Sequence, residues 1–147
     1  PGAPRLMNAG PFRNVPMALR GLLLDVPLDK RFSYDAGKNT LFVNFEGLSV
    51  RSKAQIETIG RMVASICKPL GRKVDMVANY DNFSIPPELI DDYFGMVKHL
   101  VGTYYDGVTR YTTSAFLRMK LGDEMLKRSV APHIFENLTE AERALKR

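Results

Sequence analysis

The chain has 147 residues, of which 45% are hydrophobic, and a net charge of +5. This length fits one domain with a single apolar core, and a single cysteine excludes a fold that depends on disulfides. The sequence contains no run near the ~18 apolar residues of a membrane span and no charged-then-apolar leader, so we expect a cytoplasmic protein with no membrane partner. Because it begins with Pro1 rather than methionine, we expect a processed product or part of a longer protein.

Residues 1–20 contain four prolines and two glycines without a sustained period, and we predict a flexible or extended arm there. The remaining residues, 21–147, are predicted to form one α/β domain. More than half of the excess positive charge lies in residues 1–31, which contain five Lys and Arg residues and two Asp residues. Cations spread so thinly favour a solvated arm, so we predict no nucleic-acid partner.

A hairpin and a helix are the first predicted elements. Residues 32–35 and 40–46 are strand-like, with a Gly and an Asn available for a turn between them. Ser52 and Gln55 have the spacing of a capping box, and Gly71 is placed to end the helix that follows. Apolar residues recur at helical spacing in between: Ile56, Ile59, Val63, Ile66 and Leu70.

A strand at 74–78, a polar turn at 79–87 and a helix from Glu88 follow. The helix has an unbroken apolar stripe, which consists of Leu89, Ile90, Tyr93, Phe94, Val97, Leu100, Val101 and Tyr104. Residues 108–112 then predict a third central strand, and residues 132–136 a last short one.

Two further helices complete the chain. Thr113 or Ser114 is predicted to cap a helix from Ala115 to about Arg128. Its candidate core residues are Phe116, Leu117, Leu121 and Met125. Thr139 begins a second capping box, which opens a final helix.

The element order predicts the fold class. A hairpin followed by alternating helices and strands favours a mostly parallel sheet, led by an antiparallel strand and covered by about four helices. This order is that of the SpoIIAA-like, or STAS-like, α/β sandwich.

The first candidate site is the turn at 79–87, which joins a strand to a helix start. Its candidate ligand-binding residues are Asn79, Tyr80, Asp81 and Ser84. Ser84 is a candidate phosphate acceptor or anion contact, because negative charge is favoured near a helix N-terminus. The alternative is that these polar residues close an Asx-type turn and cap the helix.

The second candidate site combines two arginines with three hydroxyls: Arg110, Thr112, Thr113, Ser114 and Arg118. Such groups at a helix start can hold a phosphate or carboxylate. Both turns follow parallel strands, so we expect them to meet at one sheet edge and to line one crevice for an anionic small molecule. The alternative is hydroxyl caps plus an arginine paired to Asp81 or Glu46.

The other chemically reactive residues indicate no further candidate site. Cys67 is predicted to be a buried apolar residue of a helix, and Glu46 a solvated charge. His99 and His133 belong to no metal-ligand spacing, so we predict no metal site and no cofactor.

Several strings together resemble a known family. They lie at residues 41–47, 79–83, 108–116, 120–122 and 132–136, and include Asn-Tyr-Asp at 79–81 and Arg-Tyr-Thr-Thr-Ser at 110–114. They resemble the C-terminal extension of bacterial acyl-CoA:acetate/3-ketoacid CoA-transferases of the propionate CoA-transferase type, over roughly residues 20–145.

The resemblance implies an accessory domain whose partners are CoA-transferase catalytic domains. In that family the catalytic glutamate and the Gly-rich CoA-binding segments belong to upstream domains. Glu46, in Phe-Glu-Gly, departs from the Glu-Asn-Gly setting of that nucleophile, so no catalytic residue is assigned. The alternative function is a stand-alone STAS-like switch or a module that binds an anion or nucleotide, with Ser84 or Thr113 modified. Self-association stays open.

Overall fold

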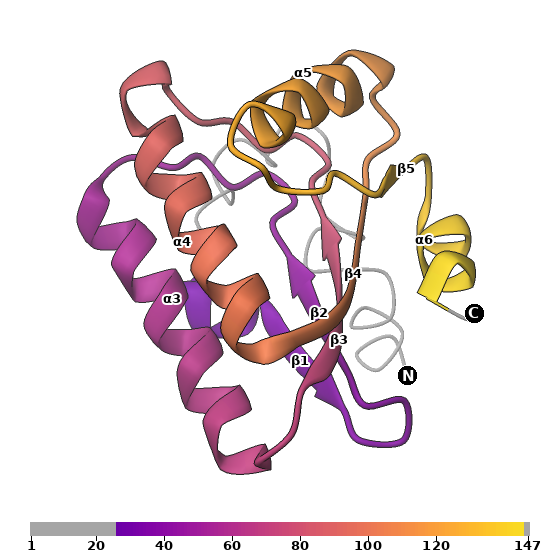
Figure 1. The fold of residues 1–147 in the computed structure, drawn as a ribbon. Helices are drawn as coiled ribbons and strands as arrows, with labels where there is room; N and C mark the ends of the chain where they lie inside the picture. The colour runs from indigo at the N-terminus through magenta and orange to yellow at the C-terminus, as the bar shows by residue number, and fades with distance from the viewer. Residues whose placement is uncertain (1–25, 146–147) are drawn as a thin grey trace, which may run out of the picture.

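Five strands form one sheet in the order β1-β2-β3-β4-β5 in the computed structural model, which describes residues 26–145 (Figure 1). β1 and β2 pair in antiparallel orientation, and the pairs from β2 to β5 are parallel. The strands are β1 (Phe32–Asp35), β2 (Thr40–Asn44), β3 (Val74–Asn79), β4 (Tyr105–Tyr111) and β5 (Ile134–Phe135). The predicted α/β fold class, a parallel sheet led by an antiparallel hairpin, is confirmed. The predicted arm at 1–20 lies outside the described residues.

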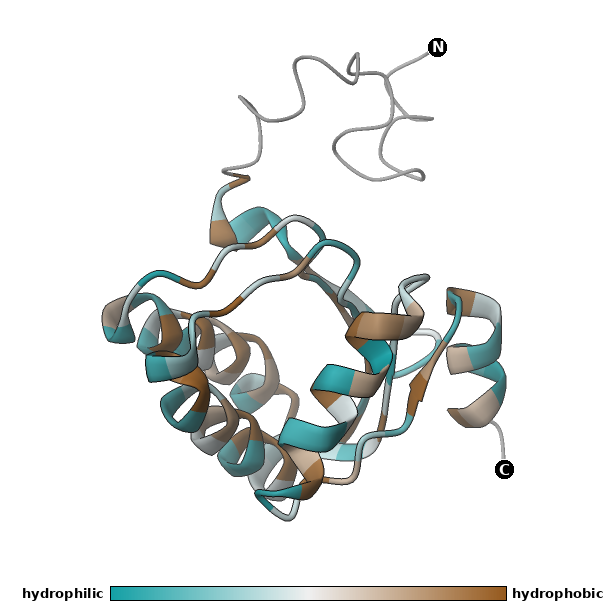
Figure 2. Ribbon diagram, turned by 90° about the horizontal axis from the view of Figure 1, so that it is seen from above, coloured by the Kyte–Doolittle hydropathy of each residue, from teal (hydrophilic) through white to brown (hydrophobic). Residues whose placement is uncertain are grey.

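Within the described residues, four α-helices surround this sheet. They are α3 (Lys53–Cys67), α4 (Ile90–Tyr104), α5 (Ala115–Leu126) and α6 (Leu138–Leu145), and short 3-10 turns occur at η2 (Leu28–Lys30), η3 (Lys68–Leu70) and η4 (Pro87–Leu89). α3 and α4 lie side by side on one face, and α6 covers the other face along β4 (Figures 1 and 2). α5 lies across the end of the sheet at which β4 finishes (Figure 1).

The core lies between the sheet and the pair α3 and α4. The predicted apolar stripes of both helices face it, with Ile56, Ile59 and Val63 from α3 and Tyr93, Phe94, Val97 and Leu100 from α4. Each such buried side chain stabilises the fold by about 1.5–3 kcal/mol. This layer holds β3 and β4 in place, and the candidate turns follow these two strands.

The start and end of the first helical segment follow the sequence signals. Ser52 Oγ accepts a hydrogen bond from the Gln55 N–H at 3.1 Å. The Gln55 side chain accepts from the Arg51 N–H at 2.7 Å, one residue before the cap. Gly71 has a φ of 66°, the left-handed conformation that ends the segment after η3.

Several predicted boundaries differ from the structure by a few residues, and two of these differences have a clear local cause. β4 begins at Tyr105 rather than at 108, because α4 passes directly into the strand and the Tyr105 side chain is buried in the core. The last helix is capped by Asn137 rather than Thr139, since Asn137 Oδ1 accepts from the Glu140 N–H at 2.9 Å. An Asn accepts this bond as well as a Thr hydroxyl does, so the helix starts earlier.

The predicted core position of Phe116 is also wrong. Its side chain is 68% exposed, whereas Leu121 and Met125 of the same helix are buried. At about 3.6 residues per turn, Phe116 lies on the side of α5 opposite these two residues. The domain covers one apolar face of α5 and leaves the other exposed.

Candidate functional site

The two predicted turns meet through one carboxylate. Asp81 Oδ1 accepts hydrogen bonds from the Thr112 hydroxyl at 2.8 Å, the Thr113 N–H at 2.8 Å and the Thr113 hydroxyl at 3.2 Å. Thr112 is fully buried, and Asp81 is half-buried. We call this contact the Asp81 junction. It joins the segments after β3 and β4, as the sequence predicts for neighbouring parallel strands.

The first turn is closed by hydrogen bonds from its own residues and from the loop after β2. The Asn79 side chain accepts from the Asp81 N–H at 2.9 Å, which closes the predicted Asx-type turn. Asn82 has a φ of 56°, a conformation that Asn tolerates better than most residues. The Gly47 N–H donates to the Asp81 carbonyl oxygen at 2.9 Å, so the loop after β2 also holds the turn.

The second turn begins α5. Ser114 Oγ accepts from the Leu117 N–H at 3.1 Å, so Ser114 rather than Thr113 is the cap. Arg118 reaches back from the helix, and its Nη1 donates to the Thr112 carbonyl oxygen at 2.6 Å. Arg118 therefore stabilises the turn from within the domain.

Arg110 lies apart from these groups. Its side chain is fully buried on the core side of β4, where Nη1 donates to the carbonyl oxygens of Ala131 at 3.1 Å and Pro132 at 2.8 Å. Nε and Nη2 have no hydrogen-bond partner among the described residues. The structure therefore does not bring Arg110 into the crevice with Arg118, and neither arginine forms an ion pair with Asp81 or Glu46 within residues 26–145.

Tyr80 and Ser84 occupy different environments. The Tyr80 hydroxyl lies 2.7 Å from the Tyr93 hydroxyl in the core, and the Tyr80 ring packs edge-on against Phe83 with centroids 4.8 Å apart. Burial, together with Tyr80, raises the pKa of Tyr93 well above its usual value. Ser84 is exposed, and its hydroxyl lies 2.9 Å from that of Ser49. Of the two, only Ser84 is accessible from outside.

The junction already contains its own anion. Three donors converge on the Asp81 carboxylate, so an external phosphate or carboxylate has to displace it to reach them. Burial raises the pKa of nearby Tyr111 to about 12, with further contributions from Asp81, Glu46 and Glu142. Binding of an anion at the predicted residues stays a prediction, and it requires that the anion displace the Asp81 carboxylate.

No family model, curated protein or solved structure matches the chain.

The remaining reactive groups do not join the junction. Cys67 is buried in α3, and burial raises the pKa of its thiol. His99 and His133 are exposed on separate elements. Within residues 26–145 no cluster of three or more His, Cys, Asp or Glu side chains is placed to hold a metal. No helix of this part of the chain has the length and apolarity needed to cross a membrane.

A groove of about 460 Å³ runs along β4, between α4 and the segment before β5. Lys98, Asp106 and His133 line it, and sequence reasoning did not group them. They come from three separate elements, and no spacing in the sequence indicates that they share one surface.

Proposed function

We propose that this chain is a STAS-like accessory domain of an acyl-CoA:carboxylate CoA-transferase, with a role in assembly, regulation or ligand sensing rather than in the transfer itself. The observation that carries the proposal is the Asp81 junction. Asn-Tyr-Asp at 79–81 and Arg-Tyr-Thr-Thr-Ser at 110–114 are the more specific of the resembling strings, and they touch through Asp81, Thr112 and Thr113.

The chemistry of the junction suits the sensing of an acid. The Thr112 hydroxyl and the N–H and hydroxyl of Thr113 form a donor set that accepts a carboxylate, at present that of Asp81. The acids handled by CoA-transferases of the resembled type have the same functional group. A carboxylate ligand that replaces Asp81 would release the turn at 79–87 and change how the segments after β2 and β3 pack.

Genetic context and turnover together test the proposal. We expect the reading frame that encodes this chain, or a neighbouring one, to encode transferase catalytic domains, and we expect the chain alone to transfer no CoA between acetyl-CoA and propionate. The two polypeptides, expressed separately, should co-elute in size-exclusion chromatography. A chain that transfers CoA by itself, or transferase domains encoded beside it that never co-elute with it, would contradict the proposal.

A second candidate is a phosphorylation switch at Ser84. Ser84 is exposed and its hydroxyl contacts Ser49, so a phosphate there would be inserted between the loops after β2 and β3. Thr113 suits modification less well, because its hydroxyl lies 3.2 Å from the Asp81 carboxylate, which would repel a phosphate. Mass spectrometry of protein purified from its host tests this candidate. Phosphate on Ser84 supports it, and unmodified Ser84 in cells under all growth conditions contradicts it.

A further inference from the structure

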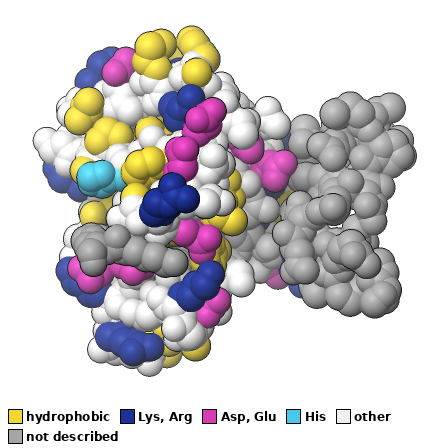
Figure 3. All heavy atoms as spheres, turned by 90° about the vertical axis from the view of Figure 1, so that its right-hand side faces the viewer, with side chains coloured by type: hydrophobic (Ala, Val, Ile, Leu, Met, Phe, Trp, Pro, Cys, Tyr) yellow, Lys and Arg dark blue, Asp and Glu magenta, His cyan; other side chains and the backbone are white. Residues whose placement is uncertain are grey.

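The groove beside β4 is enclosed by separate parts of the fold. α4 forms one wall, the first half of β4 the second, and the segment 129–133 the third. Its volume of about 460 Å³ is in the range of pockets that bind small molecules. No residue of the Asp81 junction lines it. Figure 3 views the side on which β5 and α6 lie in Figure 1, where charged side chains lie beside hydrophobic ones.

The first half of β4 has an open edge. β5 is two residues long and pairs with Arg110 and Tyr111. On this edge the Arg110 N–H donates to the His133 carbonyl oxygen at 2.9 Å. Backbone N–H groups alternate between the two edges of a strand, so the Val108 N–H faces the same edge. Because β5 does not extend to Val108, this N–H has no strand partner within residues 26–145, and it is available to a ligand.

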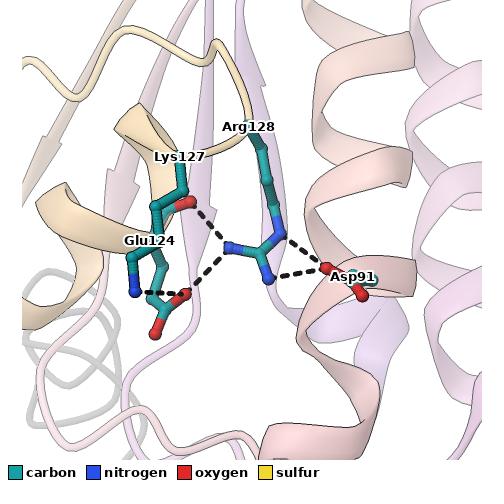
Figure 4. A network of polar contacts seen from close by, with 4 residues as sticks. All are labelled: Asp91, Glu124, Lys127 and Arg128. Carbon is teal, nitrogen blue, oxygen red and sulfur yellow. Dashed lines mark hydrogen bonds and ion pairs between the residues drawn. The ribbon is translucent and has the colours of Figure 1, made fainter.

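The third wall of the groove is fixed at two points. Arg128, at the end of α5, donates from Nε and Nη2 to Asp91 Oδ1 on α4 (Figure 4). Further along the segment, Arg110 Nη1 donates to the carbonyl oxygens of Ala131 at 3.1 Å and Pro132 at 2.8 Å. The groove is therefore formed before a ligand binds, which lowers the entropic cost of binding.

Arg110 places a positive charge behind the groove. Its side chain is fully buried, and the residue lines the groove. Nε and Nη2 have no hydrogen-bond partner, and no carboxylate pairs with the side chain, within residues 26–145. A guanidinium stays protonated, and an unpaired buried charge costs free energy. An anion in the groove would reduce this cost, since charges attract more strongly in a low-dielectric interior than in water.

The charged side chains at the opening of the groove add to this potential. Lys98 on α4 and His133 before β5 are exposed, and neither forms an ion pair within residues 26–145. Asp106 is the one carboxylate among the described residues that line the groove. The charges of Lys98 and Arg110 together exceed that of Asp106, so the groove favours an anionic ligand.

The rest of the groove is largely apolar. Hydrophobic side chains come from each of its walls and from α6: Val101, Val108, Val130, Phe135 and Ala144. Such a surface favours a ligand that has a hydrocarbon part, at about 25 cal/mol for each Å² of apolar area removed from water. The ligand that fits both properties has an anionic head and an apolar chain.

We propose that the groove beside β4 binds a small organic carboxylate with an apolar chain. The carboxylate accepts from Lys98 Nζ and from the Val108 N–H, and the buried charge of Arg110 attracts it. The chain packs along Val101 and Val130. This site does not depend on the accessory function proposed above, because it uses none of the residues of the Asp81 junction.

Isothermal titration calorimetry of the full chain with octanoate tests the site. We expect saturable binding, and a dissociation constant about tenfold higher for 1-octanol, which has the same chain without the charge. Lys98→Glu and Ala144→Trp, which reverses the charge and fills the groove respectively, should each weaken octanoate binding by about tenfold or more. Asp106→Asn should tighten it. Lys120→Glu makes the same charge change at an exposed position outside the groove and should leave binding unchanged.

Nuclear magnetic resonance locates the bound octanoate. The amide signal of Val108 should shift on titration, and Ala144→Trp should abolish the shift. Absence of saturable octanoate binding overturns the proposal, as does equally tight binding of 1-octanol. Binding that Lys98→Glu and Ala144→Trp leave unchanged, or that Asp106→Asn weakens, overturns it too. Circular dichroism confirms that the variants are folded, which is expected because the substituted side chains are exposed.

Discussion

The Asp81 junction and the exposed side of α5 are close in sequence, since two residues separate Thr113 from Phe116, yet they differ in how far the domain satisfies them. At the junction, Thr112 and Thr113 find their partner in Asp81 of the same chain. Phe116, on the first turn of α5, finds none within the described residues. A polar site whose donors and acceptors are all paired needs no ligand in order to fold. An apolar surface exposed to water is less favourable than the same surface covered by another apolar surface.

Arg110→Ala gives the largest expected effect and separates a core residue from the junction. The change leaves a cavity and removes the donor to the carbonyl oxygens of Ala131 and Pro132. We expect a loss of about 3–5 kcal/mol in the free energy of unfolding by urea, as for other large buried side chains replaced by Ala. Arg118→Ala, which removes one bond from a half-buried side chain, should cost about 1 kcal/mol. Equal losses in the two variants would mean that Arg110 is not a core residue.

Asp81→Ala tests the junction itself. Three donors lose their acceptor, and the Thr112 hydroxyl stays buried without a partner, so we expect a loss of about 2–3 kcal/mol. Asp81→Asn keeps an oxygen acceptor without the charge and should cost less. Glu88→Ala, an exposed acidic residue near the start of α4, is the control and should change stability by less than about 0.5 kcal/mol. An Asp81→Ala variant as stable as this control would show that the junction contributes nothing.

Alkaline pH should weaken the domain through Tyr111, which lies beside the junction. The folded domain raises the pKa of Tyr111 to about 12, so the unfolded chain, with a pKa near 10, loses this proton first. The contribution of Tyr111 to stability is therefore complete below pH 10 and is lost between pH 10 and 12. Unfolding followed over this range should show a shallower loss for Tyr111→Phe. An identical slope in the variant would contradict the raised pKa.

Phe116→Ser should have the smallest effect on the isolated domain. We expect a change of less than about 0.5 kcal/mol in the free energy of unfolding, because the side chain is already exposed. Leu121→Ala, on the buried face of the same helix, should cost about 2–5 kcal/mol. Similar costs in the two variants, measured by urea unfolding of dilute protein, would contradict the assignment of the two faces.

The sequence predicts the framework well because local patterns determine it. The apolar stripes of α3 and α4, the Ser52 cap and the meeting of the two turns follow from periodicity, capping and parallel order. The direction of individual side chains depends on contacts that no spacing reveals. Arg110 follows the strand alternation into the core, and Phe116 lies on the side of α5 that the sheet does not reach. In both cases residue type alone suggested the opposite environment.

In this structure the Asp81 carboxylate occupies the anion position between the two turns. Chemical rescue with sodium acetate tests this occupancy most directly. Acetate should raise the melting temperature of Asp81→Ala, by up to about 2.7 kcal/mol of stabilisation at ~100 times its dissociation constant. It should not stabilise the unmodified chain beyond sodium chloride of equal ionic strength. Equal responses of the two proteins to acetate, or no response of the variant, would contradict the claim.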